Sequence, residues 1–380
     1  MAGKVKVLEV NVDDQGNGGV FSLIKSVIEN KPDDLQIDIA ALEPFEKKEN
    51  IRHLKNLGTR IFFVGYKGNK VLKQIGIYKH MCTLLKKERY DVVHIHSDVA
   101  NKLFVSGLAA KTCGVRHIFL HAHASGMDGT GREIKQKIHF FMRERLKMLR
   151  AEYLACSYKA AKWMFPWVKK DSIKIIKNGI KLDDFRYDKR KRKEIRKGLG
   201  VKEKDILIGH VGRFMYVKNH EYILDVFKYV SDHAAASGQA GTPRLLLVGT
   251  GELLPDIRKK AGDLKIEKNV IFYGLSDNVN ELLSAVDVLV MPSFSEGFPM
   301  VGIEAQASGV PVIFSDRISK EVRINSNVRF LPIDEDSVSL WGEAVMETDT
   351  VSRRDYVDFL HEKGYDIKDM VKELVKLYKG

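Results

Sequence analysis

Short apolar runs alternate with longer amphipathic stretches along the first half of the chain. Such runs, bounded by polar or glycine-bearing turns, are typical of buried strands, and their alternation with helices indicates a parallel sheet covered on both faces. The expected strands are residues 5–11, 35–42, 60–64, 91–96, 117–121, 152–155 and 173–176. One helix is expected from the glycine loop at residues 16–19 to about residue 30, and others are expected at residues 70–87, 101–112 and 132–149.

The same pattern restarts after a very polar stretch at residues 181–204. The restart predicts two α/β domains, at residues 1–180 and 181–355, followed by a C-terminal helical segment at residues 356–380. The expected strands of the second domain are residues 206–212, 244–248, 269–273, 286–291, 310–315 and 328–331, with a helix at 336–347 and one or two amphipathic helices at 353–378. Residues 189–197 are densely basic and lack aromatic residues, so we interpret them as a solvated segment between the domains.

One stretch of the second domain combines groups that suit a phosphate ligand. After the apolar run at 286–291, a polar loop with a glycine follows, and a helix is expected from near Pro299 to Ser308, with Gly309 as its stop signal. The N-terminus of a helix favours an anion because its first N–H groups are unpaired. Glu296 in the loop and Glu304 in the helix place carboxylates on either side. A nucleotide-sugar, which has phosphates between hydroxyl-rich groups, fits this arrangement.

The most informative feature of the composition is the net positive charge. The chain of 380 residues has a formal net charge of +13 at pH 7, which implies an anionic partner such as a nucleotide, a lipid surface or a nucleic acid. No apolar run approaches the roughly 18 residues of a membrane-spanning helix, and the N-terminal run lacks the features of a signal peptide. Cys82, Cys113 and Cys156 are odd in number and have no metal-ligand spacing, so we expect reduced thiols in a cytoplasmic protein.

Several motifs together resemble those of a known family. They are Gly212-Arg213, Lys218-Asn219, Phe272-Tyr273-Gly274, Asp277-Asn278-Val279 and the stretch from Glu296 through Glu304 to Gly309. In this order, and over essentially the whole chain, the sequence resembles the GT-B retaining glycosyltransferases of family GT4, especially their bacterial capsule and exopolysaccharide branch. The resemblance implies a GT-B fold, in which two Rossmann-like, doubly wound parallel-sheet domains face a cleft. It also implies that the N-terminal domain takes the acceptor, the C-terminal domain takes the nucleotide-sugar, and the last helix crosses back to the N-terminal domain.

The resemblance implies roles for residues of the second domain. Arg213 and Lys218, which follow a strand end, would neutralise the departing diphosphate, although a solvated Arg and Lys before a helix would show the same spacing. Glu304 would hold the ribose hydroxyls and Glu296 would contact the donor sugar. The main chain of Gly297, Phe298, Pro299, Met300 and Val301 would approach the phosphates, Gly249 would line the donor site or simply reverse the chain, and the backbone of Leu275 would meet the base.

The resemblance also implies roles for two regions of the first domain. Gly18 and Gly19, in the loop after the first strand, would cover the reacting phosphate. A histidine of the family lies beside the donor sugar, and His121 matches that position better than His123, although a histidine at a strand end is commonly structural. The sequence shows no third ligand with a spacing that would complete a metal site. We therefore expect no metal and no cofactor, with the nucleotide-sugar as substrate.

The expected activity is transfer of a hexosyl group from a nucleotide-sugar, with UDP favoured over GDP, to a hydroxyl of a glycan or a polyprenyl-diphosphate-linked acceptor. The family mechanism retains the anomeric configuration and needs no metal and no nucleophilic carboxylate. The basic and apolar stretch Arg132 to Arg150 predicts either contact with an anionic membrane at the inner face or an ordinary helix with one buried face.

Two other functions remain open from the sequence. The first is a nucleotide-sugar epimerase with the same architecture, which would act without an acceptor. The second is a basic nucleic-acid-binding protein, but the chain lacks the interleaved aromatic residues that such a protein uses, so no nucleic acid is expected. A nicotinamide dehydrogenase is disfavoured because neither half has the glycine fingerprint with its downstream acid.

Overall fold

The chain forms two compact units. The computed structural model describes residues 4–15, 19–126, 132–236, 241–348 and 353–380. Unit 1 consists of Met1–Ile180 and Gly364–Gly380, and unit 2 consists of Lys181–Lys363. The C-terminal segment therefore belongs to the same unit as the N-terminal sheet.

Unit 1 contains a sheet of seven strands in the order β3-β2-β1-β4-β5-β6-β7. All neighbouring strands are parallel, and the order reverses between β1 and β4, as in a doubly wound fold. The strands are β1 Val5–Val10, β2 Leu35–Ala41, β3 Ile61–Phe63, β4 Val92–Ser97, β5 His117–Ala122, β6 Glu152–Ala155 and β7 Ile173–Ile175.

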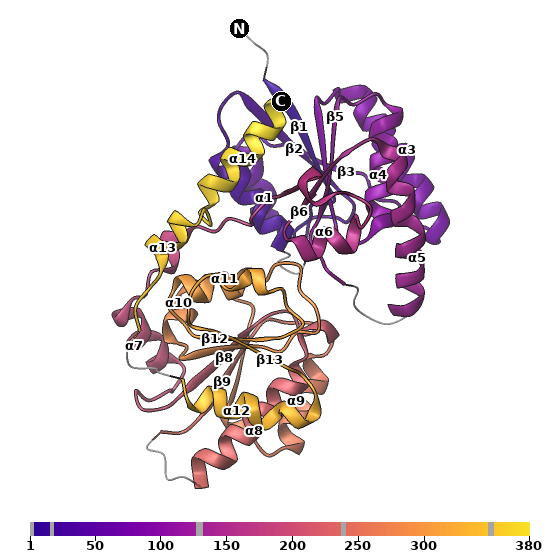
Figure 1. The fold of residues 1–380 in the computed structure, drawn as a ribbon. Coiled ribbons are helices and arrows are strands. Elements are labelled where there is room, and N and C mark those ends of the chain that lie inside the picture. Colours follow the sequence, from indigo (N-terminus) through magenta and orange to yellow (C-terminus); the bar gives the residue numbers. More distant parts are fainter. Residues whose placement is uncertain (1–3, 16–18, 127–131, 237–240, 349–352) are drawn as a thin grey trace. The chain divides into compact units, whose positions relative to one another are not determined.

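Helices cover both faces of this sheet (Figure 1). They are α1 Gly19–Asn30, α2 Lys48–Asn56, α3 Lys70–Glu88, α4 Ala100–Thr112, α5 Arg132–Arg145, α6 Tyr158–Met164 and α14 Ile367–Lys379, with a 3-10 turn η2 at Leu146–Leu149. Helices α1 and α14 contact each other on one face, and α3, α4 and α5 lie on the other. The core under α1 and α14 includes Ile24, Val27, Phe119, Met370 and Leu374. None of the described helices has the length and apolarity needed to cross a bilayer.

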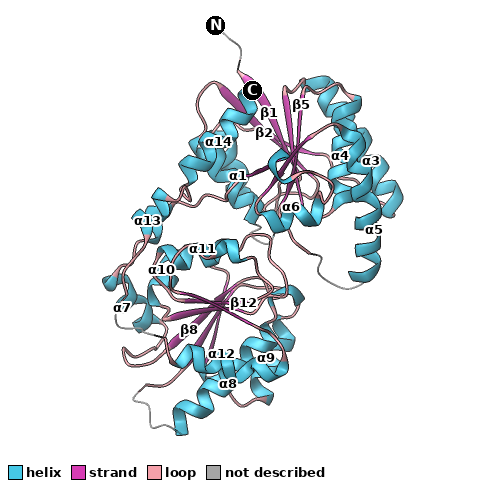
Figure 2. Ribbon diagram, viewed as in Figure 1, coloured by secondary structure: helices cyan, strands magenta, loops and turns pink. Residues whose placement is uncertain are grey.

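Unit 2 contains a sheet of six parallel strands in the order β10-β9-β8-β11-β12-β13. The strands are β8 Leu207–Val211, β9 Arg244–Val248, β10 Val270–Gly274, β11 Val288–Met291, β12 Val312–Ser315 and β13 Val328–Leu331. The helices are α7 Lys189–Gly198, α8 His220–Ala236, α9 Leu254–Asp263, α10 Val279–Ala285, α11 Met300–Ala307, α12 Val338–Met346 and α13 Val357–Glu362. Helices α8, α9 and α12 cover one face of the sheet, and α7, α10 and α11 cover the other (Figure 2).

Each apolar run expected to be a strand forms one, and the α/β prediction with two parallel sheets is confirmed. The bounds of β6, β9 and β13 coincide with the expected ranges, and the other strands differ by one or two residues at one or both ends. Strands of a parallel sheet are buried on both faces and therefore appear in the sequence as continuous apolar runs. These runs were sufficient to predict the strands.

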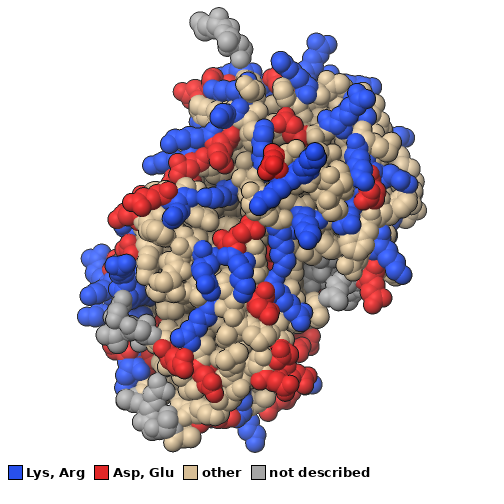
Figure 3. All heavy atoms as spheres, in the orientation of Figure 1, with Lys and Arg blue, Asp and Glu red and all other residues tan. Residues whose placement is uncertain are grey.

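The interpretation of residues 189–197 as a solvated segment was wrong. These residues form most of helix α7, which packs against α10. Arg192 and Arg196, one helical turn apart, are buried and bind the two carboxylate oxygens of Asp287 at 2.7 and 2.9 Å. Lysine and arginine side chains elsewhere on α7 remain outside, where Figure 3 shows a dense basic group on the surface. A buried ion pair of this kind leaves no signature in composition.

Candidate active site

The loops that follow β8 and β11 meet where the strand order of unit 2 reverses. In an open α/β sheet, ligands bind at this point, beyond the carboxyl ends of the strands. Two hydrogen bonds join the loops: the N–H of Phe294 donates to the carbonyl of Val217 at 2.9 Å. The side-chain amide of Asn219 donates to the carbonyl of Pro292 at 3.2 Å. The structure thus brings together the two stretches that carry the predicted cations and glutamates.

An ion pair lies at this junction. The Nζ of Lys218 is 2.6 Å from the Oε1 of Glu296, and the two side chains are 17 % and 13 % exposed. Arg213 lies on the same loop with an exposed side chain, and it forms no ion pair with the described residues. The site therefore holds two cations, one of which is already matched by a carboxylate. Both cations are placed to meet an anion.

Helix α11 begins beside this ion pair, close to the predicted start. It runs from Met300 to Ala307, and the residue before it, Pro299, makes no capping hydrogen bond through its side chain. Gly309 adopts a φ of 72° after the last turn, which matches its predicted role as the stop. The main-chain N–H groups of the first turn, at Met300 and Val301, are suited to hold phosphate oxygens.

Glu304 lies one turn inside α11. Burial raises the pKa of its carboxyl group to about 7. Its carboxylate accepts no hydrogen bond from the described residues, whereas the neighbouring Gln306 uses its amide to hold the carbonyls of Gly302 and Val322. A half-buried carboxylate that has no donor among the described residues suits a ligand that brings two hydroxyl donors.

The glycine turn after β9 packs against the loop after β8. Gly249 has a φ of 137°, and a Cβ there would lie 2.1 Å from the carbonyl oxygen of Gly212. Gly251 has a φ of 158°, and its Cβ would lie 2.3 Å from the carbonyl oxygen of Phe214. Glycine is thus required for the close approach that fixes the cation-bearing loop. Leu275, after β10, is exposed at the same edge of the sheet.

The residues predicted in unit 1 have a different environment. Gly18 lies outside the described residues, and Gly19 is the first residue of α1. His121 is fully buried in β5, inside a group of polar side chains that the sequence pattern did not bring together. This group, which we call the histidine cluster, consists of Glu9 from β1, His94 and His96 from β4, His121 and His123 at the end of β5, and Tyr378 from α14.

The strand register explains how the histidine cluster forms. Glu9 pairs with His94 across β1 and β4, and His96 pairs with His121 across β4 and β5. Paired residues and their neighbours two positions away point to the same face of a sheet. The signal in the sequence was the alternation of His94 with His96 and of His121 with His123. This alternation indicates a cluster only when the register between the strands is known, and the sequence does not supply that register.

One branch of the cluster leads to His121. The hydroxyl of Tyr378 donates to the Oε1 of Glu9 at 2.8 Å and lies 2.6 Å from the Nδ1 of His94. The Nε2 of His94 lies 3.1 Å from the Nδ1 of His121. The Nε2 of His121 is buried and has no hydrogen-bond partner among the described residues. His121 therefore ends its branch inside the core.

The other branch leads to His123 at the carboxyl end of the sheet. The Nε2 of His96 is 2.7 Å from the Oε2 of Glu9, and its Nδ1 is 2.9 Å from the Nε2 of His123. Burial works to raise the pKa of Glu9, but the adjacent His94 and His96 hold it below its usual value. Burial lowers the pKa of His96 to about 4 and also lowers the pKa of His123. The ionised carboxylate of Glu9 thus faces the neutral imidazole of His96, whose other ring nitrogen bonds His123.

Three of these histidines are close enough to be considered as metal ligands. One ligand atom from each of His94, His96 and His121 lies within 4.8 Å of the others. Both ring nitrogens of His94 and of His96 already take part in hydrogen bonds, as does the Nδ1 of His121. A metal would have to replace several of these bonds, so the described geometry is that of a hydrogen-bonded cluster.

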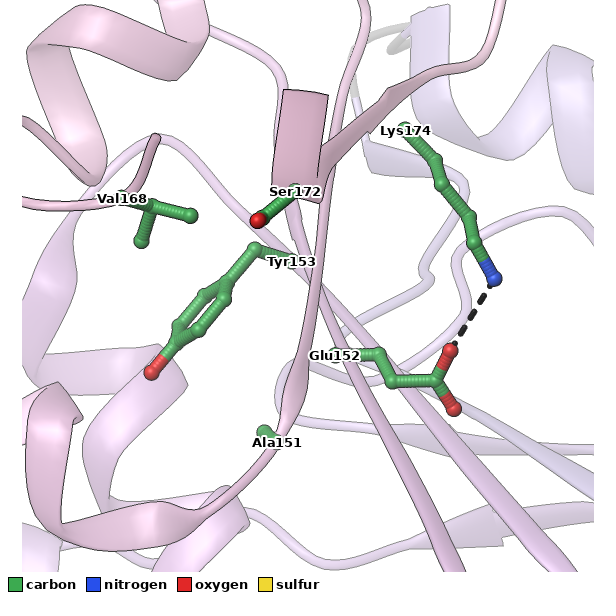
Figure 4. Close-up of a pocket in the computed structure, with 6 residues that line it drawn as sticks. All are labelled: Ala151, Glu152, Tyr153, Val168, Ser172 and Lys174. Atoms are coloured by element: carbon green, nitrogen blue, oxygen red, sulfur yellow. Dashed lines mark hydrogen bonds and ion pairs between the residues drawn. The ribbon is translucent and has the colours of Figure 1, made fainter. Parts of the chain in front are cut away.

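A cavity of about 270 Å³ lies elsewhere in unit 1 (Figure 4). Glu152 begins β6, and Lys174, the middle residue of β7, binds its carboxylate at 3.1 Å. The cavity is thus built around the amino end of β6, whereas ligands of such sheets bind at the carboxyl ends. None of the predicted site residues lines it. Its remaining lining residues are Ala151, Tyr153, Val168 and Ser172.

Comparison with known proteins identifies the class of the chain. Residues 191–338 match the family described as "Glycosyl transferases group 1". The chain is 29 % identical to the protein described as "Putative glycosyltransferase EpsF" of Bacillus subtilis, over 85 % of its own length and 83 % of that protein. It is also 29 % identical, over 64 % of its length and 61 % of the relative, to the UDP-Gal:alpha-D-GlcNAc-diphosphoundecaprenol alpha-1,3-galactosyltransferase of Escherichia coli.

Solved structures agree with the fold. Anabaena Alr3699/HepE in complex with UDP-glucose superposes with a TM-score of 0.76 at 16 % identity, over 98 % of this chain and 99 % of that one. WaaG, a glycosyltransferase involved in lipopolysaccharide biosynthesis, superposes with a TM-score of 0.73 at 14 % identity, over 98 % of this chain and 100 % of that one. The chain is therefore a glycosyltransferase with the GT-B fold that carries a group 1 glycosyltransferase domain, homologous to capsule and exopolysaccharide glycosyltransferases.

Proposed function

We propose that this protein is a retaining, metal-independent hexosyltransferase. It would take a UDP-sugar and glycosylate a hydroxyl of a lipid-linked glycan during synthesis of a surface polysaccharide. The observation that supports this best is the junction of unit 2, where the Lys218–Glu296 ion pair, the exposed Arg213 and the N-terminus of α11 converge at the switch point of the sheet. Glu304 lies one turn further along the same helix.

The chemistry follows from where charge develops. When the bond between the sugar and the diphosphate breaks, negative charge grows on the diphosphate oxygens. Arg213, Lys218 and the first N–H groups of α11 would stabilise this charge, and interactions that strengthen in the transition state raise the rate. Glu296, held by Lys218, would orient a hydroxyl of the transferred sugar. The leaving phosphate would accept the proton of the incoming hydroxyl, so retention would need no nucleophilic carboxylate.

The proposed donor and acceptor rest on relatives. The neighbour HepE was crystallised with UDP-glucose, and the E. coli relative is named for a UDP-Gal donor and a diphosphoundecaprenol-linked acceptor. An acceptor of that class lies at a membrane, which would place this enzyme at the inner face of the cytoplasmic membrane. Helix α5 of unit 1 carries basic residues together with exposed Ile134 and Phe141, so it is the surface we propose for contact with anionic lipid.

The first test is a panel of nucleotide-sugars with the native protein. Binding would be read by thermal shift, donor use by slow hydrolysis and by transfer to a synthetic polyprenyl-diphosphate-linked sugar, and stereochemistry by the anomeric signal of the product in NMR. We expect one UDP-sugar to be used and the configuration to be retained. Release of an epimerised free sugar without acceptor, or an inverted product, would contradict the proposal.

The second test concerns the two cations. Arg213→Ala and Lys218→Ala should lower kcat by about 100-fold or more, because each removes a charge aimed at the leaving group. Nucleotide binding, measured by calorimetry, should weaken much less than kcat falls. Lys320→Ala, which removes a cation from another loop of unit 2, is the matched control and should leave the rate unchanged. Full transfer rates in both active-site variants would exclude the assigned role.

A further inference from the structure

We propose that the ring of Tyr216 stacks on the apolar face of a substrate sugar, as the outer part of an aromatic platform that Tyr216 forms with Phe294 in unit 2. The inference rests on the proposed glycosyltransferase function, because it assigns a specificity-determining contact to that reaction. Neither residue belongs to the motifs that carry the family resemblance, so the resemblance gives the platform no role.

The two rings come from the two loops that meet at the switch point of the sheet. Their centroids are 4.8 Å apart and their planes are inclined by 19°, so the rings stack. Tyr216 begins the 3-10 turn η5 at Tyr216–Lys218, after β8, and Phe294 follows β11. Tyr216 is 48 % exposed, whereas Phe294 is half-buried and packs against the core of unit 2. The platform thus has a fixed base and an accessible second ring.

Hydrogen bonds between and within the loops hold the stack in place. The N–H of Phe294 donates to the carbonyl of Val217, and the side chain of Asn219 donates to the carbonyl of Pro292. The N–H of Asn219 also donates to the carbonyl of Tyr216 at 3.1 Å, which closes the turn that carries Tyr216. A ring that is fixed before binding loses little conformational freedom on binding, so more of its contact contributes to affinity.

The position of the platform favours the sugar over the nucleotide base as its ligand. Tyr216 is two residues from Lys218, Phe294 is two residues from Glu296, and the ion pair of 2.6 Å joins these two neighbours. Lys218 is proposed for the diphosphate and Glu296 for the donor sugar. Leu275, proposed for the base, follows β10, which is separated from β8 by β9. The platform therefore lies nearer to the groups proposed for the reacting end of the donor.

The chemistry of a pyranose ring matches this surface. The C–H groups on one face of the sugar carry partial positive charge, and the face of an aromatic ring is negative. The hydroxyl groups of the sugar lie around its edge, where they need donors and acceptors. Glu296 supplies carboxylate oxygens, and the guanidinium of Arg317, 5.5 Å from the ring centroid of Phe294, supplies N–H donors. An aromatic face bordered by such groups suits a sugar better than a purely apolar ligand.

The stacked sugar is either the one that is transferred or one that belongs to the acceptor glycan, and kinetics separate these two sources. Slow hydrolysis of the UDP-sugar requires only the donor, whereas transfer requires both substrates. If Tyr216 contacts the transferred sugar, its replacement raises the donor KM in both reactions. If Tyr216 contacts the acceptor, its replacement raises the acceptor KM in transfer and leaves hydrolysis unchanged.

Two substitutions separate the ring of Tyr216 from its hydroxyl group. Tyr216→Leu removes the aromatic face and keeps an apolar side chain, so we expect it to raise one of the two KM values about fivefold, as for one lost aromatic contact. Tyr216→Phe keeps the ring and should retain the native KM values, because stacking does not need the hydroxyl. Phe359→Leu, which removes a ring that is 37 % exposed on α13 of unit 2, is the control and should leave both KM values unchanged.

Binding of UDP alone shows whether Tyr216→Leu acts on the sugar or on the neighbouring cation. Tyr216 and Lys218 share one turn, so a disturbed turn would weaken the binding of UDP and lower kcat. Loss of a sugar contact should instead leave the UDP affinity, measured by calorimetry, at the native value while the KM rises. Equal losses of UDP affinity and of KM would overturn the inference, because they would indicate a displaced Lys218 or stacking on the base.

The outcomes also separate this inference from the proposed function. If the native protein uses no nucleotide-sugar of the panel, the proposed function fails, and the sugar contact of Tyr216 fails with it. If the native protein is active and Tyr216→Leu keeps the native KM values for donor and acceptor, only the inference fails. A KM raised equally in Tyr216→Phe and Tyr216→Leu would also overturn it, because the effect would then belong to the hydroxyl group and not to the ring.

Discussion

The ion pair between Lys218 and Glu296 is the most informative contact at the scale of single residues. It joins two loops that are far apart in the sequence, and it places a negative charge next to the site proposed for a diphosphate. Glu296 would therefore compete with such a diphosphate for Lys218. The same carboxylate would be needed by the donor sugar, so its effects on the nucleotide and on the sugar should have opposite signs.

Glu296→Gln tests this opposition. Removal of the charge frees Lys218, so UDP should bind about two- to fivefold more tightly, as expected for a partly exposed ion pair of up to about 1 kcal/mol. Sugar transfer should slow because the amide accepts hydrogen bonds less strongly than the carboxylate. Calorimetry with UDP and steady-state transfer rates measure the two effects. Glu252→Gln, in the glycine turn after β9, is the control; weaker UDP binding by Glu296→Gln would contradict the argument.

The raised pKa of Glu304 is expected to lower the stability of the folded protein above pH 7. Its pKa is raised from 4.5 in the unfolded chain to about 7 in the folded one, so the folded state binds more protons between these pH values. Stability therefore falls as pH rises through this window, by up to about 3 kcal/mol above pH 7. Glu304→Gln should thus unfold at higher urea concentration than the native protein at pH 8, and this advantage should shrink at pH 5.

The same variant should bind UDP more weakly, because an amide cannot accept from two ribose hydroxyls as a carboxylate does. UDP affinity of the native protein should likewise decrease as pH falls below about 7. Glu343→Gln, on the exposed side of α12, is the control for urea unfolding and should show the same difference at both pH values. If Glu304→Gln changes the urea concentration of unfolding equally at pH 5 and pH 8, burial does not shift the pKa of Glu304.

At the scale of elements, α14 packs against a sheet whose strands lie far from it in the sequence. Its apolar side, with Met370, Val371 and Leu374, packs into the core of unit 1. Its last turn carries Tyr378, which is buried and bonded to Glu9 and His94. The helix therefore supplies both apolar packing and the one hydroxyl that satisfies the inner branch of the histidine cluster.

Tyr378→Phe tests that hydroxyl without changing the packing. It leaves Glu9 and His94 short of a partner in a buried place, so the free energy of unfolding should fall by about 1–3 kcal/mol. Urea unfolding followed by circular dichroism measures the loss. Tyr66→Phe, with a side chain that is 41 % exposed, should change stability by less than about 0.5 kcal/mol. A Tyr378→Phe variant as stable as the native protein would mean that water or a rearranged side chain replaces the hydroxyl.

Some of these elements could be predicted from the sequence and others could not. Strands and the start of α11 were predictable, because apolar runs, Pro299 and Gly309 are local signals. The junction of the loops after β8 and β11 was predictable because its residues follow strands that a doubly wound order places side by side. Helix α7 was missed because two of its arginines are buried against Asp287, about 90 positions away. The histidine cluster was missed for the same reason: it depends on the register of three strands and on a helix from the other end of the chain.

At the scale of the whole molecule, the net charge of +13 exceeds what one nucleotide would neutralise, which favours an additional anionic partner. Helix α5 offers a surface for it. Ile134, Ile138 and Phe141, at spacings of four and three residues, form one exposed stripe. The guanidinium of Arg145 lies 4.3 Å from the ring centroid of Phe141. The outer side of this helix is thus apolar as well as basic, which distinguishes it from an ordinary helix with one buried face.

Flotation with vesicles tests this surface. The native protein should float with vesicles that contain phosphatidylglycerol at low salt and should be released as the salt rises, because screening weakens the contact of basic side chains with anionic lipid. Phe141→Ser should weaken binding roughly tenfold, since the side chain would no longer insert into the interface. Leu340→Ser removes an exposed apolar side chain of similar accessibility from unit 2 and should bind as the native protein does. If Phe141→Ser and the native protein float equally, charge spread over the molecule, and not insertion of Phe141, holds the protein to the vesicle. If the native protein binds neutral vesicles at high salt, an electrostatic contribution to membrane binding is excluded.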